Sequence, residues 1–137
     1  MTLLERNTEL LRRIDHLDPI ASRIEDALRR GKREQLLAGV DSTGTPYAPL
    51  AAKTRANPRR GPGGPLVADG ASSDLIVHYE VAVAIEPGRL VVSAGWPFAF
   101  VRYLKSGTRK MPRRDPGGFR AQDLATAMAI LKEHVRG

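Results

Sequence analysis

Hydrophobic positions recur at helical spacing through the first 38 residues of the chain. The first set lies on one stripe of a helix and comprises Leu3, Leu4, Leu10, Leu11, Ile14 and Leu17. Thr2 followed by Glu5 has the spacing of a capping box, which predicts that this helix begins almost at Thr2. Asp18 and Pro19 predict the end of the first helix and the start of a second, with Asp18 accepting free N–H groups. The second helix, which Gly39 ends, has an apolar face made by Ile20, Ile24, Ala27, Leu28, Leu36 and Leu37.

The period changes to two between residues 75 and 96, which predicts an antiparallel hairpin over this range. One face of its first strand is formed by Tyr79, Val81, Val83 and Ile85. The second strand alternates through Leu90, Val92, Ala94 and Trp96. Pro87-Gly88 is predicted to make the turn between them, and Leu66-Val67 a short strand before the hairpin.

Two further helices are expected after the hairpin. The first is short and ends at Gly107, and the second runs from about Ala121 to about Val135. In this last helix, Leu124, Met128, Leu131 and Val135 recur at steps of four, three and four, and this stripe is predicted to face the core of the domain. Because helices and strands do not alternate regularly, the order predicts an α+β fold: N-terminal helices, a small antiparallel sheet built on a central β-hairpin, a short helix and a C-terminal helix.

The chain, 137 residues long, is expected to form a single domain with long loops rich in Gly, Pro and Arg. Residues 1–38 form its helical N-terminal part, residues 39–74 an extended arm, and residues 75–137 a core of hairpin and C-terminal helix. Within the arm, residues 52–65 have no periodicity and little apolar surface, so we expect them to be mobile.

Positive charge is concentrated late in the chain. The net charge is +7, and residues 101–120 alone hold seven basic side chains and one acidic one. We expect an apolar half, residues 96–104, to dock on the hairpin, and a basic half, Arg109 to Arg114, to remain outside. If the arm lies near this loop, the two form one positive surface for assembly or for DNA. The residues proposed for that surface are Arg55, Arg59, Arg60, Arg109, Lys110, Arg113 and Arg114. The residues proposed for docking are Tyr47, Leu50, Trp96, Phe98 and Phe119.

Residue types suited to catalysis or metal binding are sparse. The chain has no cysteine, and its three histidines, His16, His78 and His134, fall in different predicted elements. Asp41 belongs to a turn sequence, and the glycines near residue 63 lack the Gly-Lys-Ser/Thr of a phosphate-binding loop. We therefore predict no catalytic, cofactor-binding or metal-binding residues, no cofactor, and no membrane partner.

Several short motifs occur in an order and spacing that resemble a known family. They are Gly44-Thr45-Pro46-Tyr47-Ala48-Pro49-Leu50 followed by Thr54, Leu66 with Asp69-Gly70, Phe98-Ala99 ahead of Gly107-Thr108, and Met111-Pro112-Arg113 before Phe119. Together with the hairpin and the closing helix, they make roughly residues 18–135 similar to the virion-morphogenesis or tail-completion proteins, and the related neck proteins, of tailed phages. Tyr47 stands where these proteins usually have Trp, and Phe98 where they usually have Tyr.

The resemblance implies a structural virion protein of the head-tail connection that forms a ring, commonly of six subunits. The implied partners are further copies of the chain, the connector or adaptor proteins, and the tail tube or tail terminator proteins. Non-specific contact with packaged DNA in the channel is also implied. The implied location is the virion neck, after synthesis in the host cytoplasm.

Two other functions stay open from the residues themselves. The first is a non-specific nucleic-acid-binding protein that uses the same basic loops. The second is an enzyme, such as a metal-dependent nuclease or hydrolase acting through Asp41 or Asp69, which the lack of clustered carboxylates and histidines disfavours.

Overall fold

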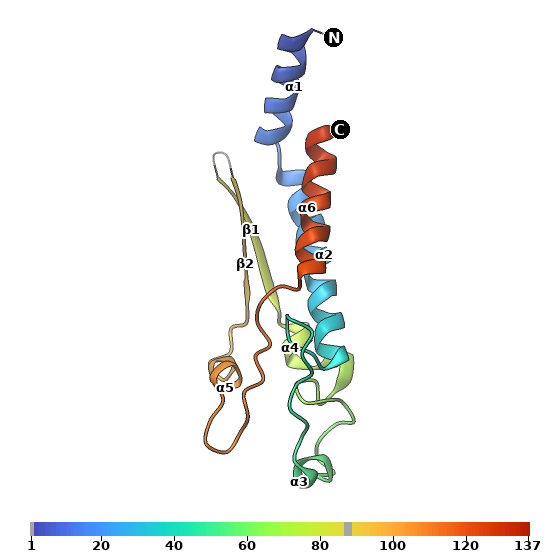
Figure 1. Ribbon diagram of the computed structural model, residues 1–137, viewed down its shortest axis with the longest axis vertical. Coiled ribbons are helices and arrows are strands. Elements are labelled where there is room, and N and C mark those ends of the chain that lie inside the picture. The colour runs from blue at the N-terminus through green and yellow to red at the C-terminus, as the bar shows by residue number, and fades with distance from the viewer. Residues whose placement is uncertain (1, 87–88) are drawn as a thin grey trace.

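Two long helices stand beside a two-stranded antiparallel sheet in an elongated molecule (Figure 1). The computed structural model describes residues 2–86 and 89–137, so the turn predicted at Pro87-Gly88 lies outside the described residues. The elements are α1 (Leu3–Asp15), α2 (Asp18–Ala38), α3 (Ala52–Arg55), a 3-10 turn (Gly70–Ser72), α4 (Asp74–Val77), β1 (Glu80–Glu86), β2 (Arg89–Gly95), α5 (Val101–Ser106) and α6 (Ala121–Arg136). This arrangement confirms the predicted α+β class.

Two predicted helix ends, at Thr2 and Gly39, are confirmed, and a third prediction, at Asp18, is wrong. The capping box of α1 is confirmed, because Glu5 N–H donates to Thr2 Oγ1 at 3.1 Å and Thr2 N–H donates to Glu5 Oε2 at 2.6 Å. Gly39 ends α2 with a φ of 70°, a conformation that costs glycine little. The predicted cap at Asp18 is wrong, since Leu17 precedes the helix and Asp18 lies in its first turn without a capping hydrogen bond.

The core lies where α2 faces the sheet. One cluster joins Leu17, Ile20, Ile24 and Leu28 to Tyr79 and Val81. A second, smaller cluster joins Leu36, Val67 and Leu75. Each of these fully buried aliphatic side chains stabilises the fold by about 1.5–3 kcal/mol. The predicted alternation of the hairpin is confirmed, because Val83, Ile85, Leu90 and Val92 pack on the first cluster from the same face.

Helix α6 packs with only part of the predicted stripe, because Leu131 contacts the first cluster as expected whereas two other members do not. Leu124 and Met128 are about half exposed, at 49% and 50%, so their assignment to the core is wrong. Ala127 and Ile130 pack on the core instead, while Asp123 is buried against α2. A Cβ built on Gly31 would lie only 2.2 Å from Asp123 Oδ1, so the absence of a side chain at Gly31 allows the two helices to approach.

Helix α1 has no buried residue and extends beyond the C-terminal end of α6 (Figure 1). Its predicted apolar stripe is largely exposed, with Leu3 at 74% and Leu4 at 76%. Hydrogen bonds join its last turn to the end of α6, from Arg13 Nη1 to Arg136 O at 2.7 Å and between His134 Nε2 and Arg13 O at 3.1 Å. The helix is therefore attached at one end and uncovered along most of its length.

The segment between α2 and the hairpin is folded locally, whereas the sequence suggested an extended arm. The N–H of Gly63 donates to Ala68 O at 2.9 Å, and Val67 is buried. Leu66 and Val67 lie in a turn region and not in the predicted short strand. The hairpin begins at Glu80, later than predicted, because residues 74–77 form α4. After the hairpin, α5 ends at Gly107 as predicted.

Among the described helices, none combines the length and the apolar character that a bilayer crossing requires.

Candidate functional site

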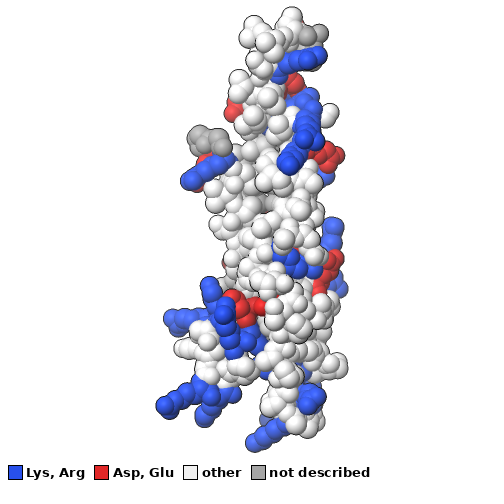
Figure 2. Space-filling model, viewed as in Figure 1, with Lys and Arg blue, Asp and Glu red and all other residues white. Residues whose placement is uncertain are grey.

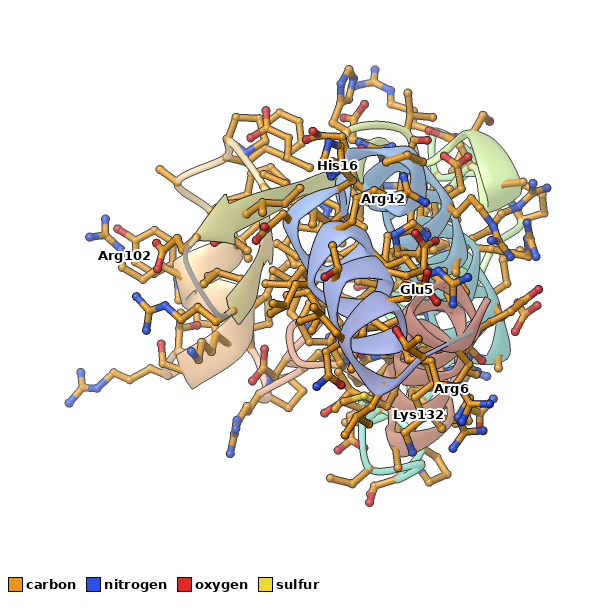
Figure 3. The ribbon with its side chains drawn as sticks, turned by 90° about the horizontal axis from the view of Figure 1, so that it is seen from above. Glu5, Arg6, Arg12, His16, Arg102 and Lys132 are labelled. Atoms are coloured by element: carbon orange, nitrogen blue, oxygen red, sulfur yellow. The ribbon has the colours of Figure 1, made fainter. Side chains whose placement is uncertain are left out.

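Exposed basic side chains gather at the end of the molecule that carries α3, α5 and the loop after α5 (Figures 1 and 2). We call this group the basic end, and it comprises Lys53, Arg55, Arg59, Arg102, Lys105, Arg109, Lys110 and Arg113. Seen from above, Arg102 extends away from the rest of the molecule (Figure 3). Within the described residues only Arg113 of this group forms an ion pair, with Asp115 at 3.5 Å. The basic end therefore presents largely uncompensated positive charge.

Two of the predicted surface arginines are committed to contacts inside the chain. Arg114, which we expected outside, is only 7% exposed, and its Nε and Nη2 atoms each donate at 2.8 Å, to Ala48 O and Pro49 O. Arg60 is partly buried and donates to Gly61 O and Gly63 O at 3.2 and 2.7 Å. The prediction that Arg114 lies outside is wrong, because two of its donor atoms bond to backbone carbonyls of the segment after α2.

The loop holding Arg109 to Arg114 is attached to α2 through a buried lysine. Lys32 is 2% exposed, and its Nζ donates to Gln35 Oε1 at 2.9 Å and to Pro116 O and Gly118 O, both at 2.7 Å. The same ammonium lies 5.6 Å from the ring centre of Tyr79. Burial lowers the pKa of Lys32 to about 8, against the opposing attraction of Asp123 and Asp115.

Tyr47, in the turn region after α2, makes a second hydrogen-bonded attachment to the same loop. Its hydroxyl donates to Asp115 O at 2.7 Å and accepts a long hydrogen bond, 3.5 Å, from Gln35 Nε2. Burial raises the pKa of Tyr47 to about 12. We call Lys32, Gln35, Tyr47 and Arg114 the polar cluster. It joins α2 and the turn after α2 to residues 114–118, and so positions the part of the basic end that contains Arg109, Lys110 and Arg113.

The remaining predicted docking residues lie in several places. Trp96 bridges the two apolar clusters and donates from Nε1 to Leu75 O at 2.7 Å. Phe119 packs on the first cluster, and Leu50, within the segment 39–74, is half-buried. Phe98 stacks on Phe100, with ring centres 5.2 Å apart. The structure therefore assigns Trp96 and Phe119 to internal packing.

An exposed aromatic surface accompanies the basic end on α5. Phe100 and Tyr103 are about half exposed, and the Arg102 guanidinium lies 5.3 Å from the ring centre of Tyr103. Aromatic rings beside basic side chains suit flat, anionic ligands such as nucleotides, and they suit protein interfaces equally well.

Sequence reasoning missed Lys32 and Gln35 as members of the buried face. A signal was present, because Leu28 and Leu36 lie two helical turns apart on one stripe and residue 32 falls between them. A lysine in this position can be buried only with acceptors from elsewhere. Those acceptors come from residues 116 and 118, which the local pattern does not place.

Groups suited to catalysis are not brought together. The Asp41 carboxylate accepts hydrogen bonds from Thr43 and from the N–H of Thr45, and the Thr43 hydroxyl is the largest cause of its lowered pKa. His16 and His134 each hydrogen-bond a backbone carbonyl of α1. In the described ranges, 2–86 and 89–137, no three His, Cys, Asp or Glu side chains are grouped as a metal site would require.

Comparison with family models, with curated protein sequences and with solved structures gives no match to this chain.

Proposed function

We propose that this protein is a structural subunit of the head-tail connection of a tailed phage, acting through self-assembly and through binding to connector and tail proteins. The observation that carries the proposal is the amount of uncovered interaction surface on a small core. Helix α1 buries none of its residues, and both α6 and α5 expose large apolar side chains. Such surfaces are typical of subunits completed by neighbours. The motif order described above supports placing the assembly in a phage neck.

The test is assembly by the purified chain. Sedimentation at increasing concentration should show a defined oligomer, with a six-membered ring as the expected species. Pull-down with the connector and tail proteins encoded beside it should retain them. A chain that stays monomeric at high concentration and retains none of these proteins would rule out the proposal. A gene position between connector and tail-tube genes would add independent support.

Non-specific nucleic-acid binding is the second candidate, and the basic end favours it. Phosphate contacts release counterions, so binding that uses Z basic side chains weakens with salt at a slope of about −0.9Z on duplex DNA. Fluorescence anisotropy with a labelled duplex at several salt concentrations measures that slope. Changing Arg109 and Lys110 to Ala should reduce its magnitude by about 2.

A matched control comes from exposed arginines outside the basic end. Changing Arg30 and Arg33 of α2 to Ala removes the same charge without touching that surface. Equal losses in both double variants would show that binding follows net charge alone. Tight binding by a monomer would favour this second function over the structural one.

A further inference from the structure

The two edges of the hairpin differ in how they are covered. The backbone of β1 is approached by α2, where Arg29 Nη2 donates to Val81 O at 3.4 Å and Val83 N–H donates to Glu25 Oε1 at 3.3 Å. Alternate residues of an antiparallel strand direct both backbone groups to the same side. The outer edge of β1 is therefore occupied by side chains of its own chain.

The register of the hairpin then determines which way β2 presents its backbone. Val81 lies opposite Ala94, and Val83 lies opposite Val92. Because Val81 and Val83 direct their N–H and C=O groups away from β2, their partners direct theirs away from β1. The backbone groups of Leu90, Val92 and Ala94 therefore point outward along the second edge.

Nothing in the described part of the chain covers that second edge. Among the described helices and strands, β2 contacts β1 alone, and no hydrogen bond joins the backbone of Leu90, Val92 or Ala94 to a described segment outside the hairpin. Figures 1 and 3 place the hairpin to one side of α2 and α6. Leu90, Val91 and Val92 are each only half-buried. A two-stranded hairpin is marginally stable, and an unpaired edge is a template for a further strand.

We propose that the outer edge of β2 pairs with β2 of a second copy of this chain, joining two hairpins into one four-stranded antiparallel sheet. The inference rests on the proposed assembly role and adds one named contact to it; this contact joins copies in pairs, whereas closing a ring needs a second, head-to-tail surface elsewhere on the chain. Because side chains of α2 occupy the edge of β1, a head-to-tail contact between β2 and β1 is blocked. The remaining possibility is a contact between β2 of one copy and β2 of the other, in which a two-fold axis relates the two identical edges.

The residues of β2 suit this self-pairing. Residues 90–95 carry no charge, so two such strands meet without repulsion. With Val92 on the two-fold axis, Leu90 lies opposite Ala94 of the second copy. Arg89 then lies opposite a glycine, while its own guanidinium is paired with Glu86. The half-buried apolar side chains of β2 would lose further exposure to water.

A cross-link tests the register directly, since the chain has no cysteine of its own. On the two-fold axis, two copies of residue 92 form a hydrogen-bonded pair with Cα atoms about 5.5 Å apart, within the range of a disulfide. Mild oxidation of Val92→Cys should give a covalent dimer in high yield. The control is Ala84→Cys, an exposed site on β1, which should stay monomeric under the same conditions.

A second variant removes the pairing without disturbing the hairpin. Ala94→Pro deletes one outward N–H, and the exposed Ala94 side chain makes the change tolerable to the core. Sedimentation should show an assembly of half the wild-type mass, because only the pairing through β2 is lost, whereas Ala94→Val, which keeps the donor, should associate as the wild type does. Circular dichroism of both variants checks that the fold is retained.

The outcomes separate this inference from the proposed function. A wild-type oligomer that survives Ala94→Pro, with no cross-link at residue 92, overturns the β2 contact and leaves the assembly role standing. A wild-type chain that remains monomeric and retains no phage protein overturns both.

Discussion

Lys32 shows how one buried charge can position a surface loop. Its ammonium donates to three oxygens, one from Gln35 on its own helix and two from Pro116 and Gly118. These two carbonyls belong to the loop between α5 and α6, called the basic loop here, and lie more than 80 positions later in the chain. A charged group is retained in the interior only when such partners are supplied, because its desolvation is costly. The exposed position of the basic loop therefore depends on a residue that is itself hidden.

Replacing Lys32 by Met tests this role. The variant leaves Pro116 O and Gly118 O without their donor, and a buried unsatisfied group such as that of Pro116 costs about 1–3 kcal/mol. We expect the free energy of unfolding in urea to fall by about 2 kcal/mol or more. Arg33→Met, an exposed change on the same helix, should alter it by less than about 0.5 kcal/mol. Equal effects would contradict the role given to Lys32.

The same lysine predicts a pH dependence. Its pKa is about 8 in the folded protein and 10.5 as the ordinary value, so the unfolded chain binds more protons between these pH values. Stability should therefore rise with pH through this window, by at most about 1.4 kcal/mol per unit. Tyr47 has the opposite effect on stability above pH 10: its pKa is raised to about 12, so the folded chain keeps a proton that the unfolded chain loses. Urea unfolding between pH 7.5 and 9.5 should show the rise in the wild type and its absence in Lys32→Met.

Adjacent arginines in the basic loop should behave differently. Arg114→Ala removes two hydrogen bonds from a buried guanidinium and should lower the free energy of unfolding by about 2–3 kcal/mol. Arg113→Ala removes an exposed ion pair and should change it by less than about 1 kcal/mol. Thermal and urea unfolding of both variants measures the difference. Similar stabilities would mean that the burial of Arg114 has little energetic weight.

At the scale of elements, the α2–α6 contact depends on a residue without a side chain. In an isolated helix, changing Gly to Ala adds about 1 kcal/mol of stability. At Gly31 the added methyl would collide with the Asp123 carboxylate, which Arg120 holds at 2.7 and 2.8 Å. We therefore expect Gly31→Ala to destabilise the protein by about 1–3 kcal/mol.

The control for this change combines it with the removal of the obstacle. Gly31→Ala in an Asp123→Ala background should recover part of the loss relative to Asp123→Ala alone. A double-mutant cycle from urea unfolding measures that coupling. A stabilising effect of Gly31→Ala in the wild-type background would contradict the close packing described.

Helix α1 should contribute little to the stability of a single chain. Leu4 and Leu11 are exposed, so changing both to Gln removes no core contact. The free energy of unfolding at low protein concentration should stay within about 0.5 kcal/mol of the wild type. Ile24→Ala, a change in the core, should cost about 2–5 kcal/mol in the same assay. A large loss in the leucine variant would show that α1 is part of the folding unit.

Local patterns predicted the elements well and their contacts less well. The capping box at Thr2, the stop at Gly39 and the alternation of Val81 and Val83 all depend on neighbours in the sequence, and each is confirmed. The prediction for the buried face of α6 is confirmed at Leu131 and wrong at Leu124 and Met128, whose apolar spacing fits a helix equally well when they face outward. The choice between faces depends on the approach of Asp123 to Gly31, which no local pattern reveals.

The sequence predicted which exposed basic residues belong to the candidate site, but not the contacts that hold their loop in place. The sequence places Arg109, Lys110 and Arg113 in a basic loop, and the structure exposes all three. The sequence could not reveal that Arg114 turns inward, because the carbonyls that accept hydrogen bonds from Arg114 lie 65 and 66 positions away in the chain. Contacts over such separations depend on the complete fold.

At the scale of the whole molecule, the middle and the loop of residues 105–118 are held in place by different kinds of contact. The middle is joined by the apolar clusters between α2 and the sheet, whereas residues 105–118 contribute no side chain to either cluster. That stretch is attached through the polar cluster, by hydrogen bonds from Lys32, Tyr47 and Arg114. This separation is one of forces, since both sets of contacts contribute to the global free energy of unfolding.

This separation has a consequence for motion. Regions with few buried apolar contacts open at a lower free energy than the global unfolding reaction. Amide hydrogens of the basic loop that bond to the rest of the chain, such as that of Arg114 to Leu104 O, should exchange before those of α2. Lys32→Met should accelerate exchange in the loop far more than in α2, as measured by mass spectrometry or NMR. The loop of residues 105–118 would thus open locally, so that a neighbouring subunit can change its conformation while the core stays folded.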